Sequence, residues 1–445
     1  MPKLTMHLGL DDTDSARNGC TTYIAALLVE KLEKLKVKFI DYPNLVRLNP
    51  NVPWKTRGNG ALCLRFEYDE EREGKIKEAA ICLLEEQADL DFKGTDPGIV
   101  FFKKHQIPQE VKDFARNALT GIVTLKEATK LVKKFEGEAL GYNTCRGIIG
   151  ALAAIGENLE GDHTYELIAY RTPESRGAKR KVDADSIFEM DKLTQPYTFN
   201  NVDLEKRRVI ITPRGPDPIL LGIRGEKPEI VRKAFALVKP LEPVERWVIF
   251  RTNQGTDAHF TKVPELSEIK PYSSVVAKAV VSRNPRLIPL RHVVFSVRDD
   301  GAEVDCAAYE PTDALRKVAR KLIVGDLVEV YGAVRRPSEG KALTINLEKI
   351  NILSLAQKVT HENPVCPTCS KRLESMGKGK GFRCKKCRVR FGQAQKSEII
   401  ESRNVGLGLY LTSTRSQRHL TKPHRRYGLE KSLQEPVSMI EQWHS

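Results

Sequence analysis

The chain has 445 residues, a formal net charge of +15, and 40% hydrophobic and 29% charged residues. This length exceeds what one hydrophobic core supports, so we expect three or four domains. The sequence contains no apolar run of the ~20 residues that span a bilayer, and its N-terminus lacks the apolar stretch of a secretory signal. We therefore expect a cytoplasmic protein with no membrane partner, and the positive charge favours an anionic one.

The first motif is acidic and follows an expected strand over Met6–Leu10. A helix is expected to begin near Thr21 or Thr22, either of which can cap it. Carboxylates at the end of a strand can hold Mg²⁺, and a helix N-terminus can hold a phosphate. We therefore predict a magnesium and nucleotide-phosphate site here. Its carboxylates are those of Asp11, Asp12 and Asp14.

A loop with cations and glycines follows further along the chain. Glycine lets backbone N–H groups approach an anion, and Lys and Arg neutralise it. The loop therefore suits phosphate contact, with a plain turn as the alternative. Its residues are Lys55, Thr56, Arg57, Gly58, Asn59 and Gly60. A second turn, which ends at Gly98 before an expected strand over Ile99–Phe102, is a weaker candidate for the same role.

Strands and helices alternate through the middle of the chain. Residues 146–156 are apolar and rich in small side chains, which indicates a closely packed helix. Strands are expected over Thr164–Tyr170 and Trp247–Phe250, and a helix over Pro228–Leu237. Residues 171–200 are polar and are expected to form a long connection. This alternation fits an α+β domain of the ferredoxin-like type.

From residue 272 onward the pattern changes to strands. Five are expected, with one helix over Thr312–Leu322 between the third and the fourth. This order is that of an OB-fold, a small barrel that usually binds oligonucleotides or oligosaccharides. The basic region that follows favours nucleic acid over a purely structural barrel. The expected strands are Val275–Val281, His292–Val297, Ala302–Tyr309, Leu327–Val334 and Leu343–Ile352.

Four of the nine cysteines form two C-x2-C pairs separated by 14 residues. This spacing is typical of a tetrahedral thiolate zinc site, and the glycine-rich spacer predicts the β-hairpin of a zinc ribbon. Four thiolates leave no open position, so the zinc is expected to be structural and to supply folding free energy. The ligands are Cys366, Cys369, Cys384 and Cys387. Two other cysteines, Cys63 and Cys82, are expected in a hydrophobic core.

Most of the positive charge lies near the C-terminus. From Lys371 to Ser445 there are 17 Lys and Arg against six Glu and no Asp, a net charge of +11. A solvated basic tail is one interpretation, but the zinc motif in the same region favours contact with a phosphate backbone. For the tail, a disordered arm is weighed against a segment that orders against RNA. The expected RNA-binding cations are Lys378, Lys380, Arg383, Lys385, Lys386 and Arg388 on the ribbon, and Arg418 and Lys422 in the tail.

The motifs form an ordered set along the chain. They are Asp11–Ser15 with Gly19–Thr22, Arg47–Gly60, Thr95–Gly98, Arg146–Gly156, Gly222–Gly225, Thr252–Asn253 with Thr256–Asp257, and the zinc ribbon. Each alone is weak, but in this order they resemble the archaeal tRNA 2-agmatinylcytidine synthetases over almost the whole chain.

The resemblance implies a specific activity. The family modifies the wobble cytidine of an isoleucine tRNA with a CAU anticodon, so that the tRNA reads AUA. ATP activates the C2 carbonyl, agmatine displaces the activated oxygen, and ATP ends as AMP and phosphate. The implied cofactors are ATP, Mg²⁺ and Zn²⁺, and the implied partners are agmatine and the tRNA.

The resemblance also assigns roles to residues. The N-terminal domain would be kinase-like, the three aspartates would bind magnesium, and Thr21 stands where the family has an autophosphorylation site. Agmatine carries a guanidinium and an amine, so we expect carboxylates around it, with Asp217 and Asp257 as candidates.

Together these features predict a multidomain α+β chain. Its parts are an ATP-binding kinase-like α/β domain (1–125), a ferredoxin-like domain (126–265), an OB-fold β-barrel (266–357), a zinc ribbon (358–395) and a basic C-terminal tail (396–445). One alternative is a single-stranded nucleic-acid-binding protein, which leaves the acidic motif without a purpose. Another is a different ATP-dependent RNA kinase or ligase. The sequence carries no signal for an oligomeric state.

Overall fold

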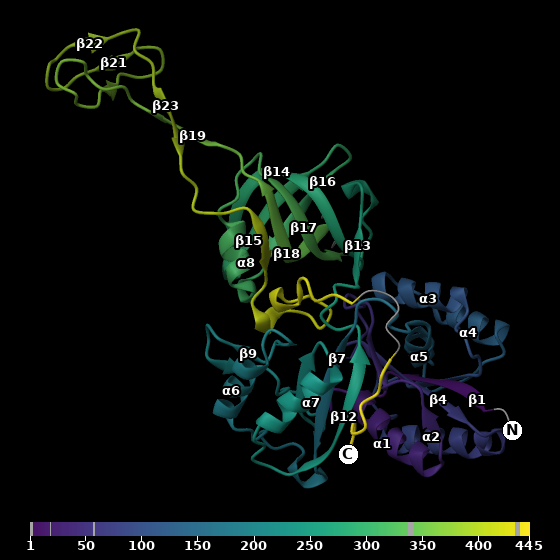
Figure 1. The fold of residues 1–445 in the computed structure, drawn as a ribbon. Helices are drawn as coiled ribbons and strands as arrows, with labels where there is room; N and C mark the ends of the chain where they lie inside the picture. Colours follow the sequence, from purple (N-terminus) through teal and green to yellow (C-terminus); the bar gives the residue numbers. More distant parts are fainter. Residues whose placement is uncertain (1–2, 18, 57, 337–341, 432–436) are drawn as a thin grey trace.

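A computed structural model describes residues 3–17, 19–56, 58–336, 342–431 and 437–445. Two consecutive parts of the chain, residues 4–141 and 164–252, contribute strands to one ten-stranded sheet (Figure 1). The strand order is β6-β5-β1-β4-β3-β12-β7-β11-β8, with β2 beside β4. The two parts meet where β3 runs parallel to β12, with Asn44 opposite Arg251. The strands are β1 (Leu4–Asp11), β2 (Lys38–Phe39), β3 (Asn44–Arg47), β4 (Gly60–Tyr68), β5 (Gly98–Phe102), β6 (Glu138–Gly141), β7 (Thr164–Arg171), β8 (Thr198–Phe199), β11 (Ile219–Gly225) and β12 (Val244–Thr252).

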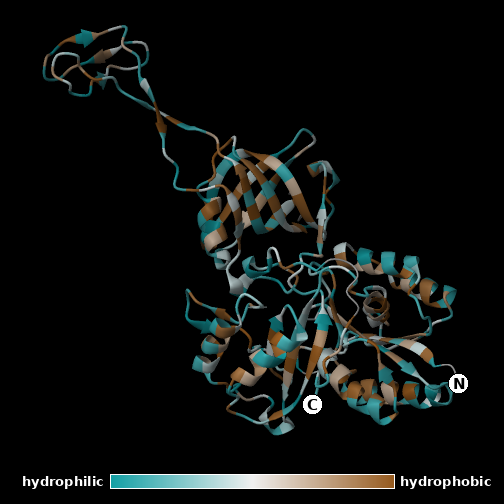
Figure 2. Ribbon diagram, viewed as in Figure 1, coloured by the Kyte–Doolittle hydropathy of each residue, from teal (hydrophilic) through white to brown (hydrophobic). Residues whose placement is uncertain are grey.

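Helices cover both faces of the first half of this sheet. Alternate residues of β4 enter opposite cores: Leu62 packs with α1 (Thr21–Lys34) and α2 (Glu73–Gln87), whereas Cys63 packs against the other helices. The helix ribbons of both layers contain hydrophobic and hydrophilic stretches (Figure 2), and their buried residues belong to the cores on the two faces of the sheet. Cys63 is buried as expected, but the prediction for Cys82 is wrong, because it lies exposed on α2. The helices of the second layer are α3 (Gln109–Thr120), α4 (Leu125–Lys134) and α5 (Gly147–Gly156).

The second half of the sheet carries α6 (Ala184–Thr194) and α7 (Pro228–Leu237). Residues 171–200 were expected to be a connection without regular structure, and α6 shows that this prediction is wrong. The helix is short and rich in polar residues, and Ile187 and Met190 are its only buried apolar side chains. A short hairpin of β9 (Val202–Asp203) and β10 (Arg208–Val209) follows.

A closed β-barrel lies above this sheet (Figure 1). Its strands pair in the order β14-β15-β16-β18-β17, and β17 pairs back to β14. The five expected strands and the helix between the third and fourth are confirmed. The elements are β13 (Phe260–Lys262), β14 (Ser274–Ile288), β15 (His292–Arg298), β16 (Glu303–Ala308), α8 (Ala314–Ala319), β17 (Leu327–Arg335) and β18 (Thr344–Ser354).

A narrow stalk projects from the barrel and carries a small cysteine-rich unit at its tip (Figure 1). The stalk pairs β19 (Lys358–Glu362) with β23 (Ser397–Glu401). The tip holds the three-stranded sheet of β20 (Glu374–Ser375), β21 (Phe382–Arg383) and β22 (Arg390–Phe391). Short 3-10 helices lie at Glu70–Arg72, Pro173–Ser175, Leu266–Glu268, Pro289–Arg291, Glu310–Thr312, Thr414–Ser416 and His424–Arg426.

The C-terminal segment, described over residues 408–431 and 437–445, returns to the body of the protein. It begins as β24 (Gly408–Leu411), which pairs with β18. It then runs between the barrel and the sheet (Figure 1), where Leu420 and Arg426 are buried, and it ends with Trp443 in the core of the sheet. The disordered arm weighed for the tail is corrected, because the described residues of this segment are ordered against the protein itself.

No helix in the described part of the chain is long and apolar enough to cross a membrane.

Candidate active site

A cavity of about 250 Å³ lies where β1 and β3 end, beside the start of α1 and the C-terminal segment. The predicted residues that line it are Asp11, Asp12, Asp14, Thr21, Lys55, Thr56, Gly58, Asn59, Gly60 and Asp217. Two motifs more than 30 residues apart in sequence therefore share one cavity. Arg57 lies outside the described residues. Gly98 is not among the residues that line the cavity. It is the first residue of β5, where it lies opposite Asp11 of β1 and against the first turn of α5.

Asp11 and Asp12 form the acidic wall of the cavity. Burial, and then the charge of Asp12, raise the pKa of Asp11 well above its usual range. A Cβ atom on Gly150 of α5 would lie 1.8 Å from Oδ2 of Asp11, so only glycine admits this carboxylate. Burial also raises the pKa of Asp12 to about 6, against the opposing charge of Arg146. Two desolvated carboxylates side by side are an environment that a cation stabilises.

Two side chains connect Asp12 to its surroundings. Thr56 Oγ1 donates to Oδ1 of Asp12 at 3.3 Å, which joins the cationic loop to the acidic motif. Arg146 Nη2 lies 3.5 Å from Oδ2 of Asp12 and 2.8 Å from Oδ2 of Asp96. Arg146 therefore places a positive charge beside the two carboxylates.

Asp14 receives the first N–H group of α1. Thr21 N donates to Oδ1 of Asp14 at 2.8 Å, and Thr21 Oγ1 donates to the same atom at 3.1 Å. The residue at the cap position is Cys20, whose side chain makes no capping hydrogen bond. The helix begins at Thr21 as expected, but the capping oxygen comes from Asp14. The result is a hydroxyl at the edge of a cavity, held against a carboxylate that can accept its proton.

The two candidate agmatine residues lie in different environments. Asp217 lines the cavity, and its Oδ1 lies 3.0 Å from Nη2 of Arg180. Asp257 is not among the lining residues; its Oδ2 lies 2.5 Å from Nζ of the buried Lys349. The structure therefore brings only Asp217 to the acidic motif.

Sequence reasoning missed three cavity-lining residues, Arg47, Arg146 and His419. Arg146 had a local signal, since it directly precedes the apolar helix α5. Arg47 had one as well, since it begins the Arg47–Gly60 motif, whereas His419 had none, because it reaches the cavity from the C-terminal segment.

The four cysteines of the ribbon form one cluster. Their sulfur atoms all lie within 4.8 Å of one another, and Cys369 Sγ and Cys384 Sγ are 3.5 Å apart. Ligands about 2.3 Å from a tetrahedral zinc would lie roughly 3.8 Å apart, so the cluster fits this ion. No other such group of His, Cys, Asp and Glu occurs in the described ranges, so Asp11, Asp12 and Asp14 do not by themselves form a closed set of three ligands. Magnesium usually takes only one or two carboxylates, together with the phosphates of a substrate.

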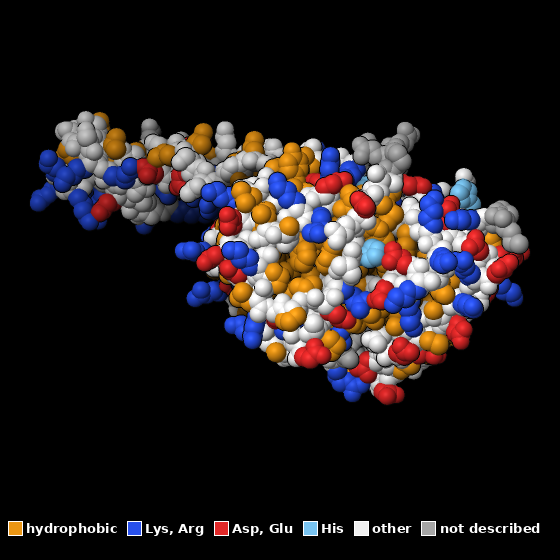
Figure 3. Space-filling model, turned by 60° about the horizontal axis from the view of Figure 1, so that its bottom comes forward, with side chains coloured by type: hydrophobic (Ala, Val, Ile, Leu, Met, Phe, Trp, Pro, Cys, Tyr) orange, Lys and Arg blue, Asp and Glu red, His pale blue; other side chains and the backbone are white. Residues whose placement is uncertain are grey.

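The ribbon carries a cationic surface at one end of the molecule (Figure 3). Arg383 and Lys385 form ion pairs with Glu374. The other predicted RNA-binding cations of the ribbon form no ion pair with any described residue. They are Lys378, Lys380, Lys386 and Arg388.

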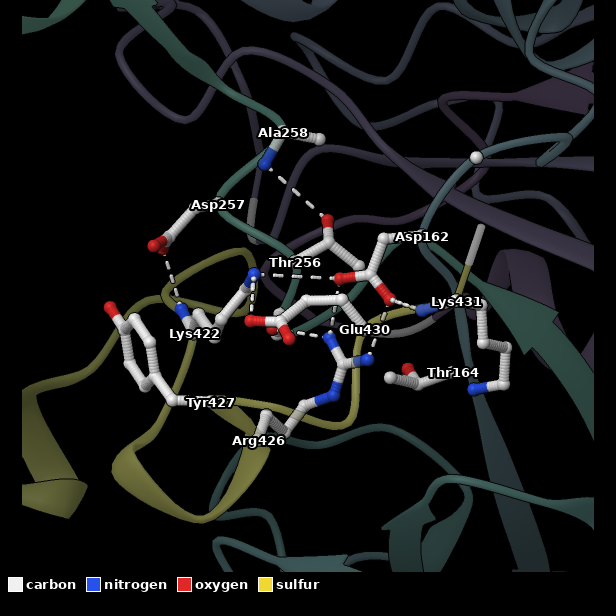
Figure 4. Close-up of polar contacts among 12 residues, drawn as sticks. Asp162, Thr164, Thr256, Asp257, Ala258, Lys422, Arg426, Tyr427, Glu430 and Lys431 are labelled. Carbon is white, nitrogen blue, oxygen red and sulfur yellow. Dashed lines mark hydrogen bonds and ion pairs between the residues drawn. The ribbon is translucent and has the colours of Figure 1, made fainter. Parts of the chain in front are cut away.

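The two predicted RNA contacts of the tail are paired within the protein. Arg418 Nε lies 3.2 Å from Oε1 of Glu348. Lys422 Nζ lies 3.0 Å from Oε1 of Glu430 and also approaches Asp162 (Figure 4). These cations therefore hold the C-terminal segment in place.

Three family models match the chain: the TiaS TCKD domain over residues 7–144, the TiaS FLD domain over 145–259 and the TiaS C-terminal zinc ribbon domain over 363–405. The chain is 42% identical to the tRNA 2-agmatinylcytidine synthetase TiaS of Methanocaldococcus jannaschii, over 94% of this chain and 98% of that protein. The protein of the same name from Archaeoglobus fulgidus is also 42% identical, over 95% and 98% of the two chains.

Solved structures give the same result. A crystal structure of TiaS in complex with an isoleucine tRNA and ATP matches with a TM-score of 0.86 and 40% identity, over 94% of this chain and 97% of that one. One of TiaS in complex with the same tRNA, AMPCPP and agmatine matches with a TM-score of 0.83 and 38% identity, over 94% and 96%. The matching domains, the sequence identity of about 40% over almost the whole chain and the similar structures show that the chain belongs to the TiaS family of tRNA 2-agmatinylcytidine synthetases.

Proposed function

We propose that this chain is an ATP-dependent ligase that attaches agmatine to C2 of the wobble cytidine in a CAU-anticodon isoleucine tRNA. The product is 2-agmatinylcytidine, and the modified tRNA reads AUA. The observation that carries the proposal is the shared cavity, in which Asp12 and the Asp14–Thr21 pair lie beside the Lys55–Gly60 loop. Relatives of this chain are named for the same activity and are crystallised with tRNA, ATP and agmatine.

The chemistry explains why such a cavity is needed. The C2 carbonyl of cytosine is a poor electrophile, and phosphorylation turns its oxygen into a leaving group. The agmatine amine then attacks C2, the C2–O bond breaks, and the oxygen leaves with one phosphoryl group as phosphate. The second phosphoryl group of ATP passes to water, so ATP ends as AMP and two phosphates. The wobble base must leave the anticodon stack to enter the cavity.

Each group of cavity residues has a role in this reaction. Lys55, with the backbone N–H groups around Gly58, would bind the phosphates of ATP. Thr21 is placed to accept a phosphoryl group, with Asp14 as the base for its hydroxyl. Asp217 is the remaining carboxylate in the cavity wall for the guanidinium of agmatine.

Asp11, Asp12 and Asp14 are the residues that would hold Mg²⁺. Their carboxylate oxygens are the ligands this ion prefers, and burial of Asp11 beside Asp12 favours a bound cation. When bound, the ion neutralises phosphate charge.

The domain types follow the same proposal. The first part is an ATP-binding kinase-like domain, and the second is ferredoxin-like. The barrel is an OB-fold, because it has the strand order and the single helix that are typical of this fold. The zinc ribbon would bind RNA. The proposed location is the cytoplasm, where tRNA is modified.

Incubation with labelled agmatine, ATP and a tRNA transcript with a CAU anticodon tests the function. Agmatine should enter the tRNA only when ATP is present, and a transcript with a CAU→GAU anticodon is the matched control. Binding of the tRNA without any incorporation of agmatine would refute the proposal.

A further inference from the structure

Arg47 is a partly buried cation for which the described part of the protein supplies no ion-pair partner. Its guanidinium borders the cavity and a second hollow beside it. Among the described residues no carboxylate forms an ion pair with it, and its Nε is buried without a hydrogen-bond partner. An unpaired charge in such a place is costly unless a ligand supplies the opposite charge.

Arg65, a buried arginine of the same sheet, has the set of contacts that Arg47 lacks. Arg65, on the neighbouring strand β4, donates to Asn44 Oδ1 at 2.7 Å and to the carbonyl oxygens of Ile155 and Glu157 at 3.0 and 3.2 Å. Arg65 therefore has a structural role that its contacts explain. The guanidinium of Arg47 has no such set of contacts with the residues that the structure describes.

The position of Arg47 is nevertheless fixed. Asn253 holds its main chain from both sides, because Oδ1 accepts from Arg47 N at 2.8 Å and Nδ2 donates to Arg47 O at 2.9 Å. A Cβ atom on Gly58 would lie 2.6 Å from Nη1 of Arg47, and one on Gly60 would lie 2.8 Å from it. These two glycines of the cationic loop leave the space that the guanidinium occupies.

His419 places a second donor beside Arg47. Its Nδ1 lies 2.9 Å from Nη2 of Arg224, a donor, and 2.9 Å from Oε1 of Gln254, an acceptor. The ring proton is assigned to Nε2, because the charged guanidinium cannot accept a hydrogen bond and outweighs the neutral amide oxygen. A Cβ atom on Gly58 would lie 3.3 Å from this Nε2. Burial, with the charges of Arg47 and Arg224, lowers the pKa of His419 well below its usual range, so the ring is neutral.

The C-terminal segment holds His419 at this place. The carbonyl oxygen of His419 accepts from Gly255 N at 2.8 Å, and that of Leu420 accepts from Asp257 N at 2.8 Å. The loop that follows β12 therefore fixes both Arg47, through Asn253, and His419.

We propose that Arg47 and the Nε2–H of His419 form a phosphate-binding subsite next to Gly58, so that the two ends of the chain complete the active site together. This rests on the proposed function, which brings two phosphate-bearing ligands, ATP and tRNA, to the cavity. A phosphoryl group there would receive a charge-assisted hydrogen bond from Arg47 and a neutral one from His419.

The test compares Arg47→Gln and His419→Gln with the full wild-type chain, and Arg116→Gln, on the exposed face of α3, is the control. Dissociation constants for ATP, AMP and the tRNA are measured separately. If the subsite binds the outer phosphates of ATP, Arg47→Gln raises the Kd of ATP about tenfold or more and leaves those of AMP and tRNA unchanged. If it binds a tRNA phosphate, only the tRNA Kd rises, and its salt dependence becomes shallower.

Thermal unfolding separates a binding role from a structural one. A ligand-binding Arg47 predicts that Arg47→Gln unfolds at the same or a higher temperature than the wild type without ligand, but loses most of the stabilisation by ATP or tRNA. A lower unfolding temperature with unchanged dissociation constants would overturn the proposal. Should Arg47→Gln not fold, His419→Gln decides: its Kd for one of the two ligands rises about threefold or more, or the proposal fails.

These outcomes are distinct from failure of the proposed function. A wild-type chain that binds ATP and tRNA but never incorporates agmatine would refute the proposed reaction, and the binding comparison would still decide the subsite.

Discussion

Arg426 Nε donates to Oε1 of Glu226 at 2.6 Å, and the two side chains are 0% and 5% exposed. The guanidinium also reaches both carboxylate oxygens of Asp162, at 2.7 and 3.0 Å (Figure 4). Arg426, which lies near the C-terminus, thus pairs with two carboxylates beside the strands β7 and β11. This pairing fixes the C-terminal segment that carries His419.

Removal of Arg426 should therefore destabilise the protein strongly. Arg426→Ala removes the guanidinium that pairs with the buried Glu226 and the partly buried Asp162. Breaking a buried pair costs about 3–5 kcal/mol, and we expect the lower end of this range because Lys431 and Lys422 still lie beside the two carboxylates. Denaturant unfolding measures the loss. Arg415→Ala is the control, since its pair with Asp313 at 3.3 Å is more exposed and should contribute less than about 1 kcal/mol. Equal stability of the two variants would contradict the assigned role of Arg426.

Asp12 should be essential for the reaction but not for tRNA binding. Asp12→Ala removes a proposed magnesium ligand and the partner of Thr56 and Arg146. We expect agmatine incorporation to fall by roughly two orders of magnitude or more, while the tRNA Kd stays within about twofold. Asp113→Ala, on the exposed face of α3, is the control. Retained activity would remove Asp12 from the metal site.

Thr21 can be tested with its hydroxyl kept or removed. Thr21→Ser keeps the hydroxyl and should keep most of the activity, whereas Thr21→Val keeps shape and the N–H bond to Asp14 but should lose transfer of radiolabel from the γ-phosphate of ATP to the protein. Mass spectrometry of the labelled protein identifies the site. If Thr21→Val is labelled and active, the hydroxyl has only a structural role.

Zinc removal should weaken RNA binding and spare the ATP site. The ribbon lies at the tip of the stalk, far from the sheet (Figure 1), and its small core consists largely of the cysteines. Chelation, or Cys384→Ser, should unfold it and raise the tRNA Kd by about tenfold or more at low salt, with the ATP Kd unchanged. Cys82→Ser, which alters an exposed cysteine outside the ribbon, is the control. An unchanged tRNA Kd after chelation would show that the ribbon is not an RNA grip.

Glu348 should make stability depend on acid pH. Burial alone would raise its pKa, but Arg418 and His259 lower it to about 2. A carboxylate with a depressed pKa stabilises the folded state fully above its ordinary value near 4.5, and this stabilisation is lost as the pH falls toward 2. Unfolding from about pH 6 to about pH 2 should therefore show a loss in the wild type that is smaller in Glu348→Gln. Parallel curves for the two proteins would contradict this assignment.

Local sequence patterns determined most of the elements. The five barrel strands, α1 and the apolar helix α5 follow from hydrophobic periodicity, which each stretch carries by itself. The zinc cluster follows from ligand spacing alone. The polar helix α6 was missed because only two of its buried side chains, Ile187 and Met190, are apolar, which leaves little hydrophobic periodicity to detect.

The site divides in the same way. The acidic motif and the cationic loop carry their chemistry in consecutive residues, so the sequence by itself indicated Asp12 and Lys55. Only the tertiary structure decided that Asp14 caps α1, that the C-terminal segment packs inside the protein, and that Arg47 and His419 meet at Gly58. The physical reason is that these contacts join residues far apart in the chain. Burial and hydrogen bonding, which determine the protonation and orientation of these side chains, exist only once the chain has folded.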